Sequence, residues 1–369
     1  MGDETRSALH IQPGCTAAKR AAGRRAGTMQ RPALSPERLI EGIRLGDRTL
    51  LAKAITLVES SRPDDQKAAE RVFRDCPPTT GNTIRVGITG APGVGKSSLI
   101  EALGSYLIIQ RSEKVAVLAI DPSSQLSGGS ILGDKTRMPF LSSSEMAFIR
   151  PSPSRGMHGG LSQHTREAIR LCEAAGYRNV IVETVGVGQS DSSVRAMVDF
   201  VMLVTIPGAG DELQGMKRGV MEMANLVVVN KADGDNLHAA ERARVGAESA
   251  LRFLRTSASG WVPRAISCSA HAGRGISDIW SSVLDFVDLA TENRWLERMR
   301  RDQTRHALYE ELEQGLMQMF RADSVVQQRM TELERQIIAG QATMTSATLE
   351  LLNLFAARVD RGQGKLTMS

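Results

Sequence analysis

A glycine-rich octapeptide is the strongest chemical pattern in the sequence. Residues 90–97 read GAPGVGKS and fit the phosphate-loop pattern G-x-x-x-x-G-K-[ST] at every fixed position. The apolar run Ile84–Thr89 before it predicts a strand, and Ser98–Leu103 after it predicts the start of a helix. A phosphate loop requires this strand–loop–helix context, so we expect the segment to bind the phosphates of a nucleoside triphosphate.

Each part of the octapeptide has a predicted role. Glycines allow the backbone to curl until its N–H groups point at phosphate oxygens, and the positive end of the following helix adds to the attraction. Lys96 would neutralise the β- and γ-phosphates, and the Ser97 hydroxyl would ligate Mg²⁺. The alternative is a glycine-rich turn without a ligand. The residues expected to contact the nucleotide are Gly90, Ala91, Pro92, Gly93, Val94, Gly95, Lys96, Ser97 and Ser98.

A second pattern predicts which base the nucleotide carries. Asn230, Lys231 and Asp233 form an N-K-x-D sequence directly after the predicted strand Leu226–Val229. An Asp carboxylate at this place can accept hydrogen bonds from the N1–H and the exocyclic amine of guanine, whereas adenine would leave it desolvated and unpaired. We therefore expect GTP or GDP as the ligand. The residues of a later loop that resemble a contact to the guanine oxygen are Ser267, Ser269 and Ala270.

Acidic residues at the ends of other predicted strands are candidates for metal binding and hydrolysis. Asp121 follows the strand Val115–Ile120, and Glu183 follows Val180–Val182 at a place where most small GTPases carry an Asp. Ligands of open α/β sheets bind at the carboxyl ends of the strands, so both carboxylates could hold Mg²⁺-bound water or orient the attacking water. Gly186 offers a backbone N–H to the γ-phosphate.

Two further glycine-rich loops could respond to hydrolysis. Residues 128–137 contain a central acidic residue, Asp134, and residues 207–217, which include Lys217, follow a predicted strand. Ordinary surface loops would have the same composition. Because both loops lie between nucleotide motifs, we favour the interpretation that they are switch segments.

The elements that must position these residues alternate between strand and helix. Further strands are predicted at Phe200–Val204 and Ala265–Ser267, and helices at Thr165–Ala175 and Ala239–Arg255. Such alternation from about residue 84 to 290 predicts a mostly parallel sheet with helices on both faces. The expected fold class is therefore α/β, of the phosphate-loop NTPase type, with helical extensions at both ends.

The flanking regions complete the expected domain organisation. Residues 35–75 predict two or three helices, and the charged region after Trp295 predicts long helices that pack on their own domain or on a partner subunit. One face of the first long helix would carry Leu308, Leu312, Leu316, Met319 and Phe320. We expect a disordered leader at 1–34, an N-terminal helical segment at 35–78, the nucleotide-binding domain at 79–290 and a helical arm at 291–369.

Charge and composition exclude several classes of function. The 369 residues carry a formal net charge of +5, and residues 1–28 hold five basic against two acidic side chains, so the remaining body is close to neutral. A near-neutral body argues against a nucleic-acid partner. No apolar run approaches the ~18 residues that span a bilayer, so we expect no membrane association. The cysteines form no C-x-x-C pair, which suits free thiols in a reducing cytoplasm.

Residues 1–28 leave two interpretations open. They lack the apolar core of a secretory signal. An Arg-rich and Ala-rich organelle transit peptide is one alternative, although acidic residues near its start argue against it. The favoured alternative is a disordered extension ahead of a natural beginning at Met29.

Taken in order, the motifs resemble a known family. The segments GAPGVGKS, DPSS, GGSILGDKTRM, RPSP, ETVGVGQS, PGAGDELQG and NKAD are similar to those of the MeaB/ArgK family. These are SIMIBI-class phosphate-loop GTPases associated with methylmalonyl-CoA mutase. The likeness runs from about residue 36 to 290, and the helical regions at the two ends also resemble those of the family in type.

The resemblance implies a homodimeric, metallochaperone-like GTPase, slow on its own. Such a protein gates adenosylcobalamin delivery to methylmalonyl-CoA mutase, or a related acyl-CoA mutase, and protects that enzyme. By matching motif, Lys96 and Ser97 would bind phosphate and Mg²⁺, while Asp121, Asp134 and Glu183 would serve the metal and the catalytic water.

The flanking loops and helices also have counterparts in the family. The loop 207–217 is similar to a family switch that senses the mutase, and the C-terminal helices resemble the family's dimerisation arm. One departure is Gln125–Ser127, where many members have Thr-Arg-Thr, and residues 1–28 have no counterpart.

Other GTPases and a kinase are the alternative interpretations of these motifs. A nickel-delivery GTPase would need a His-rich tract or a Cys/His cluster, and neither is present in the sequence. A signal-recognition-type targeting GTPase would need a Met-rich signal-binding domain or a basic RNA-binding face. A kinase that uses ATP has no use for a guanine-specific loop at Asn230–Asp233. We therefore expect a guanine-nucleotide switch that acts on a client enzyme.

Overall fold

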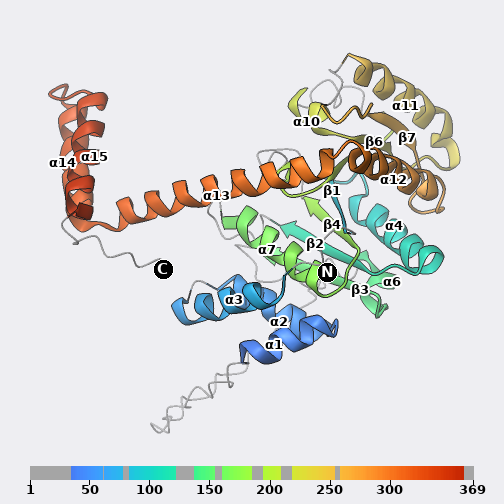
Figure 1. Cartoon of the computed structure of the whole chain (residues 1–369). Helices are drawn as coiled ribbons and strands as arrows, with labels where there is room; N and C mark the ends of the chain where they lie inside the picture. The colour runs from blue at the N-terminus through green and yellow to red at the C-terminus, as the bar shows by residue number, and fades with distance from the viewer. Residues whose placement is uncertain are drawn as a thin grey trace, which may run out of the picture. The chain divides into compact units, whose positions relative to one another are not determined.

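A parallel sheet forms the centre of the fold (Figure 1). The computed structural model describes residues 35–60, 62–77, 83–121, 137–153, 160–184, 194–208, 218–253 and 258–360, and all statements below refer to these residues. Seven strands pair there, each parallel to its neighbours. In spatial order they are β3 (Ala147–Pro153), β2 (Val115–Asp121), β4 (Asn179–Thr184), β1 (Ile84–Gly90), β5 (Phe200–Thr205), β6 (Leu226–Val229) and β7 (Arg264–Ser267).

Helices cover both faces of the sheet, as the alternating pattern predicts. Met202 of β5 packs in one cluster with residues of α4 (Lys96–Arg111) and α12 (Ile276–Glu292). The next residue, Leu203, packs in another cluster with α11 (Leu237–Arg252). Successive strand residues point to opposite faces, so both faces of β5 are covered by helices. The expected α/β fold class is confirmed, and β3 is a strand that the sequence did not predict.

The other helices of the core lie beside these. The helix α7 (Gly160–Ala174) packs on β2 and β4, and α6 (Pro139–Ser143) packs on α4. Short elements precede β6 and α11, namely α10 (Arg218–Met223) and the 3₁₀ turn η2 (Gly234–Asn236). The carboxylate of Glu101 on α4 accepts the backbone N–H groups of Phe140 (2.6 Å) and Leu141 (3.2 Å), which caps the first turn of α6.

Three helices precede the sheet. They are α1 (Pro36–Arg44), α2 (Arg48–Val58) and α3 (Pro63–Asp75). Ser35 and Asp47 cap the first two, because their side-chain oxygens accept backbone N–H groups of the first turn. The helix α2 packs against α7, and Glu59, which directly follows α2, pairs with Arg150 of β3. This helical unit therefore covers one side of the sheet edge at β3.

The C-terminal region is helical, as expected. The helices α14 (Ser324–Ile338) and α15 (Met344–Asp360) lie side by side and bury Val326, Leu333, Ala347 and Leu351 between them (Figure 1). The helix α13 (Trp295–Ala322) has no buried residue, and its Leu308, Leu312 and Leu316 are each more than half exposed. The three leucines of the apolar stripe predicted on α13 are therefore uncovered in the single chain, whereas Phe320 of the same stripe packs against the α14–α15 cluster.

No helix in the described part of the chain is both long enough and apolar enough to cross a bilayer.

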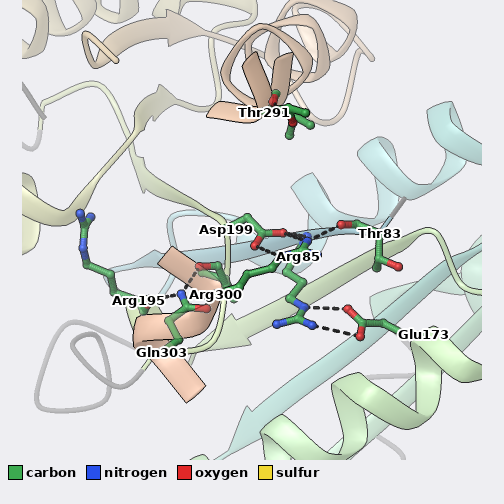
Figure 2. Close-up of polar contacts among 10 residues, drawn as sticks. Thr83, Arg85, Glu173, Arg195, Asp199, Thr291, Arg300 and Gln303 are labelled. Atoms are coloured by element: carbon green, nitrogen blue, oxygen red, sulfur yellow. Dashed lines mark hydrogen bonds and ion pairs between the residues drawn. The ribbon is translucent and has the colours of Figure 1, made fainter. Parts of the chain in front are cut away.

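A buried carboxylate attaches α13 to the sheet (Figure 2). Asp199 precedes β5 and is only 3% exposed. Its oxygens accept hydrogen bonds from Arg300 Nε (2.8 Å) and Arg300 Nη2 (2.6 Å) and from the backbone N–H of Arg85 (2.9 Å). The Arg85 guanidinium in turn forms a bidentate pair with the buried carboxylate of Glu173 on α7. This network joins α13, β1, β5 and α7 beneath the amino ends of the strands.

The Asp199–Arg300 pair yields a stability prediction. Replacing Arg300 by Met removes the guanidinium and leaves a buried charge, so we expect the free energy of unfolding to fall by about 3 kcal/mol. Urea denaturation of the full chain measures this. The double variant Asp199→Asn/Arg300→Met should lose less than the sum of the two single variants. Arg301→Met, a change at the exposed neighbour, is the control, and equal urea midpoints for Arg300→Met and Arg301→Met would contradict the prediction.

Candidate functional site

The phosphate-loop residues lie between β1 and α4, at the carboxyl end of the central strand. Gly95 caps α4 with a left-handed backbone (φ 92°), and a methyl group on it would lie 2.6 Å from Nδ2 of Asn230. Only glycine fits here, because any other residue would be strained by the left-handed backbone and its Cβ would displace Asn230. Pro92, Gly93 and Ser98 are exposed, so part of the loop faces solvent.

Lys96 and Ser97 occupy the first turn of α4. Lys96 is 7% exposed, and its ammonium donates hydrogen bonds to the carbonyl oxygens of Gly90 (2.7 Å) and Ala91 (3.1 Å). The Ser97 hydroxyl donates to Oε1 of Glu183 at 3.0 Å. Three of the residues predicted to act together are therefore within one small region at the end of β1 and β4.

Glu183 and Asp121 come from neighbouring strands. Glu183 is 8% exposed and lies beside Ile88 of β1 in the sheet register. Asp121 is the last residue of β2, one position beyond the pair Ile120–Thr184 that joins β2 to β4. The backbone thus brings both acidic positions to the same edge, as sequence reasoning predicted. Ser97 Oγ and Glu183 Oε1 are oxygen ligands of the kind that Mg²⁺ prefers.

Asn230 connects the phosphate loop to the second predicted motif. Its side chain is buried and donates from Nδ2 to the carbonyl oxygens of Val94 (3.0 Å) and Gly95 (3.4 Å). Its Oδ1 accepts the backbone N–H of Ala270 at 3.1 Å and the thiol of Cys268 at 3.5 Å. One amide therefore fixes the separation of the phosphate loop and the loop after β7.

Lys231 and Asp233 complete the motif. Lys231 has a left-handed backbone (φ 60°), and its ammonium donates to the carbonyl oxygen of Gly93 at 2.9 Å. The Asp233 carboxylate accepts the hydroxyl of Ser269, whose oxygen accepts the backbone N–H of Ala272 at 3.0 Å. Asp233 thus has a fixed orientation beside Ala270, and its carboxylate can accept hydrogen bonds from a base. Ser267 is the last residue of β7, directly before this loop.

Sequence reasoning missed two residues that stabilise the second motif. The Arg274 guanidinium donates to the carbonyl oxygen of Ala232 at 2.9 Å, and the Arg274 backbone pairs with Ser269. Burial, and next the charge of Asp233, raise the pKa of the Cys268 thiol to about 12, so Cys268 stays neutral and donates to Asn230. Neither role has a local sequence signal, because each depends on contacts across the loop.

Several predicted residues lie outside the described part of the chain. These are Asp134, Gly186 and Lys217, together with residues 122–136, 185–193 and 209–217, which include most of both predicted switch segments and the Gln125–Ser127 departure. The side chain of Asp121 is also not described. In the residues that are described, no group of three or more His, Cys, Asp or Glu side chains is arranged to hold a metal ion.

Known proteins resemble this chain over most of its length. Residues 51–325 match the model of the family described as methylmalonyl-CoA mutase-associated GTPase MeaB. The protein named GTPase ArgK from Escherichia coli K12 is 49% identical over 278 residues, which are 75% of this chain and 84% of that protein. The mitochondrial methylmalonic aciduria type A homolog of Caenorhabditis elegans is 41% identical over 334 residues, covering 86% of this chain and 82% of that protein.

A solved structure shares the fold as well. The crystal structure of a protein named LAO/AO transport system kinase superposes with a TM-score of 0.71 at 38% sequence identity, and the match covers 87% of this chain and 98% of that one. The family match, the relatives and the arrangement of the phosphate and base loops agree. This chain is a GTPase that belongs to the methylmalonyl-CoA mutase-associated MeaB family.

Proposed function

We propose that GTP binds with its phosphates on residues 90–98 and its guanine against Asp233 and Ala270. The observation that carries this proposal is the Asn230 side chain, which bonds to the phosphate loop on one side and to the base loop on the other. The separation of the two loops is thereby fixed, as a ligand of fixed covalent length requires. Asp233 would accept the N1–H and the exocyclic amine of guanine, and Ser267 and Ser269 line the same loop.

The proposed hydrolytic machinery lies at the other end of the nucleotide. Lys96 would move from the loop carbonyls to the β- and γ-phosphates, and its charge would oppose the charge that develops on the transferred group. Ser97 would hold Mg²⁺, with Glu183 and Asp121 positioned to hold the metal's water or the attacking water. When bound, Mg²⁺ neutralises phosphate charge. Asp134 and Gly186 are assigned to this machinery from their place in the sequence.

We propose that the client is methylmalonyl-CoA mutase or a related acyl-CoA mutase. The family description and the name of the Caenorhabditis elegans relative support this assignment. The protein would use its nucleotide state to gate adenosylcobalamin delivery and to protect the mutase. The loop 207–217 would sense the client. A site completed by a partner is slow alone and faster in the complex.

We further propose that the protein is a homodimer assembled through its C-terminal helices. On α13 the side chains of Leu308, Leu312 and Leu316 recur at four-residue steps, and more than half of each is exposed. A continuous exposed apolar stripe of this kind is typical of an interaction surface. The proposed arm resembles that of the family.

Base recognition by Asp233 can be tested with a single exchange. In Asp233→Asn the NH₂ donor of the side-chain amide would face the donors of guanine, so we expect GTP to bind about 100-fold more weakly. Xanthosine triphosphate, which carries an oxygen in place of the exocyclic amine, should bind the variant more tightly than GTP. Competition against a fluorescent nucleotide measures both affinities. Asp235→Asn, at an exposed neighbour, should bind GTP normally, and unchanged GTP affinity in Asp233→Asn would disprove the assignment.

Client recognition can be tested through GTP turnover. We expect hydrolysis by the purified protein to rise about tenfold or more when a methylmalonyl-CoA mutase is added, because the partner completes the site. ATP should not be hydrolysed in either mixture, and Lys96→Ala should abolish the stimulated rate. Turnover of GTP that is unaffected by the acyl-CoA mutases tested would refute the proposed client while leaving the GTPase activity intact.

The dimer proposal is tested by charge on the exposed stripe of α13. In Leu312→Glu/Leu316→Glu two carboxylates would have to be buried at the interface, so the variant should be monomeric. Light scattering coupled to size-exclusion chromatography measures the mass. Val262→Glu, an exposed apolar residue on the nucleotide-binding core, is the control and should remain dimeric. A wild-type protein that elutes with the mass of one chain would rule out the homodimer.

A further inference from the structure

A side chain of α13 holds a short turn of the nucleotide-binding core. Residues Val194–Val198 contain a helical turn, in which the N–H groups of Met197 and Val198 bond to the carbonyl of Val194. The last carbonyls of such a turn have no partner within it. Gln303 supplies a hydrogen-bond donor for these carbonyls, because its Nε2 donates to the carbonyl oxygens of Arg195 (3.0 Å) and Val198 (2.9 Å) (Figure 2).

The turn held by Gln303 is packed tightly on the central strand. A methyl group on Gly87 of β1 would lie 2.5 Å from Cγ1 of Val194 and 3.0 Å from Cγ2 of Val198. The absence of a side chain at Gly87 thus lets both valines contact the backbone of β1. Movement of the turn would therefore press on the strand, because protein interiors have no free volume to absorb it.

Strand β1 leads directly to the reacting end of the site. Gly87 is three residues before Gly90, the first glycine of the phosphate loop. The next residue, Ile88, lies beside Glu183 of β4 in the sheet register. The path from Gln303 to Lys96, Ser97 and Glu183 thus consists of one hydrogen-bonded turn and one strand.

A second contact extends this arrangement to the crossover before β6. The Arg195 guanidinium donates from Nη1 to the carbonyl oxygen of Met223 at 2.6 Å, at the end of α10. The backbone carbonyl of Arg195 also accepts the hydrogen bond from Gln303 Nε2. Beside it, Arg300 fixes Asp199 at the end of the turn. The end of α10 is therefore bonded to the segment before β5, and that segment is in turn bonded to α13.

We infer that Gln303 is a positioning residue for GTP hydrolysis, and that it acts through the turn Val194–Val198 and strand β1 on the phosphate loop and Glu183. The inference rests on the proposed roles of Lys96, Ser97 and Glu183. It assigns α13 a task beyond the attachment of the C-terminal arm. The geometry of the reacting groups depends on a helix that contains none of the nucleotide motifs.

The test separates positioning from folding by comparing hydrolysis with binding. In Gln303→Met, which has a similar shape and helix propensity but no donor, single-turnover GTP hydrolysis by the full chain should fall about fivefold, because small displacements of reacting groups reduce rates. The dissociation constants of GTP and GDP should change less than about twofold. Gln303→Lys, which restores a donor to the two carbonyls, should recover the wild-type rate.

Two further variants make the outcome unambiguous. Gln314→Met changes a half-buried glutamine about three turns further along α13 and should hydrolyse GTP at the wild-type rate. Gln303→Asn keeps the amide but shortens its reach, and it replaces Gln303→Met if thermal unfolding shows that the latter is not folded. A wild-type rate in the Gln303 variant used, or no recovery with Gln303→Lys, would overturn the inference. Glu183→Gln with undiminished hydrolysis would instead refute the proposed site.

Discussion

The site depends on one buried amide. Asn230 uses both polar atoms of its side chain. Its Nδ2 donates to the carbonyls of the phosphate loop, and its Oδ1 accepts hydrogen bonds from Ala270 and Cys268. Because the amide is buried, each unmade bond would cost on the order of 1–3 kcal/mol, so the two loops can separate only at a considerable energetic penalty. The protonated thiol of Cys268 and the missing side chain of Gly95 both serve this contact. The base loop is thus held at a constant distance from the phosphate loop.

The position of β1 explains why so few contacts are needed to assemble the reacting end. This strand is central, with β4 on one side and β5 on the other, and it leads into the phosphate loop. All neighbours are parallel, so the carboxyl ends of several strands meet at one edge. Glu183 consequently reaches Ser97 across 86 positions of sequence. At the opposite edge, the amino ends of the strands contact Arg300 and Gln303 of α13.

The sequence predicts the parts of the site whose geometry is local. The phosphate loop and the N-K-x-D motif each need only a few consecutive residues, and their flanking apolar runs predicted the strands correctly. The strand β3 was missed because its two prolines and one arginine break the apolar pattern, which an edge strand tolerates. The contacts of Arg274, Gln303 and Arg300 have no such signal. Arg300 meets Asp199 across 101 positions, and only the folded chain brings them together.

The buried charge of Asp199 has a consequence for dissecting the chain. Its carboxylate belongs to the sheet, whereas the cation that neutralises it belongs to the second turn of α13. A fragment that ended where the nucleotide motifs end would keep the anion and lose its counter-ion. The nucleotide motifs therefore end earlier in the chain than the contacts that stabilise their domain. A fragment that keeps the stability of the full chain must therefore extend into α13 at least as far as Arg300.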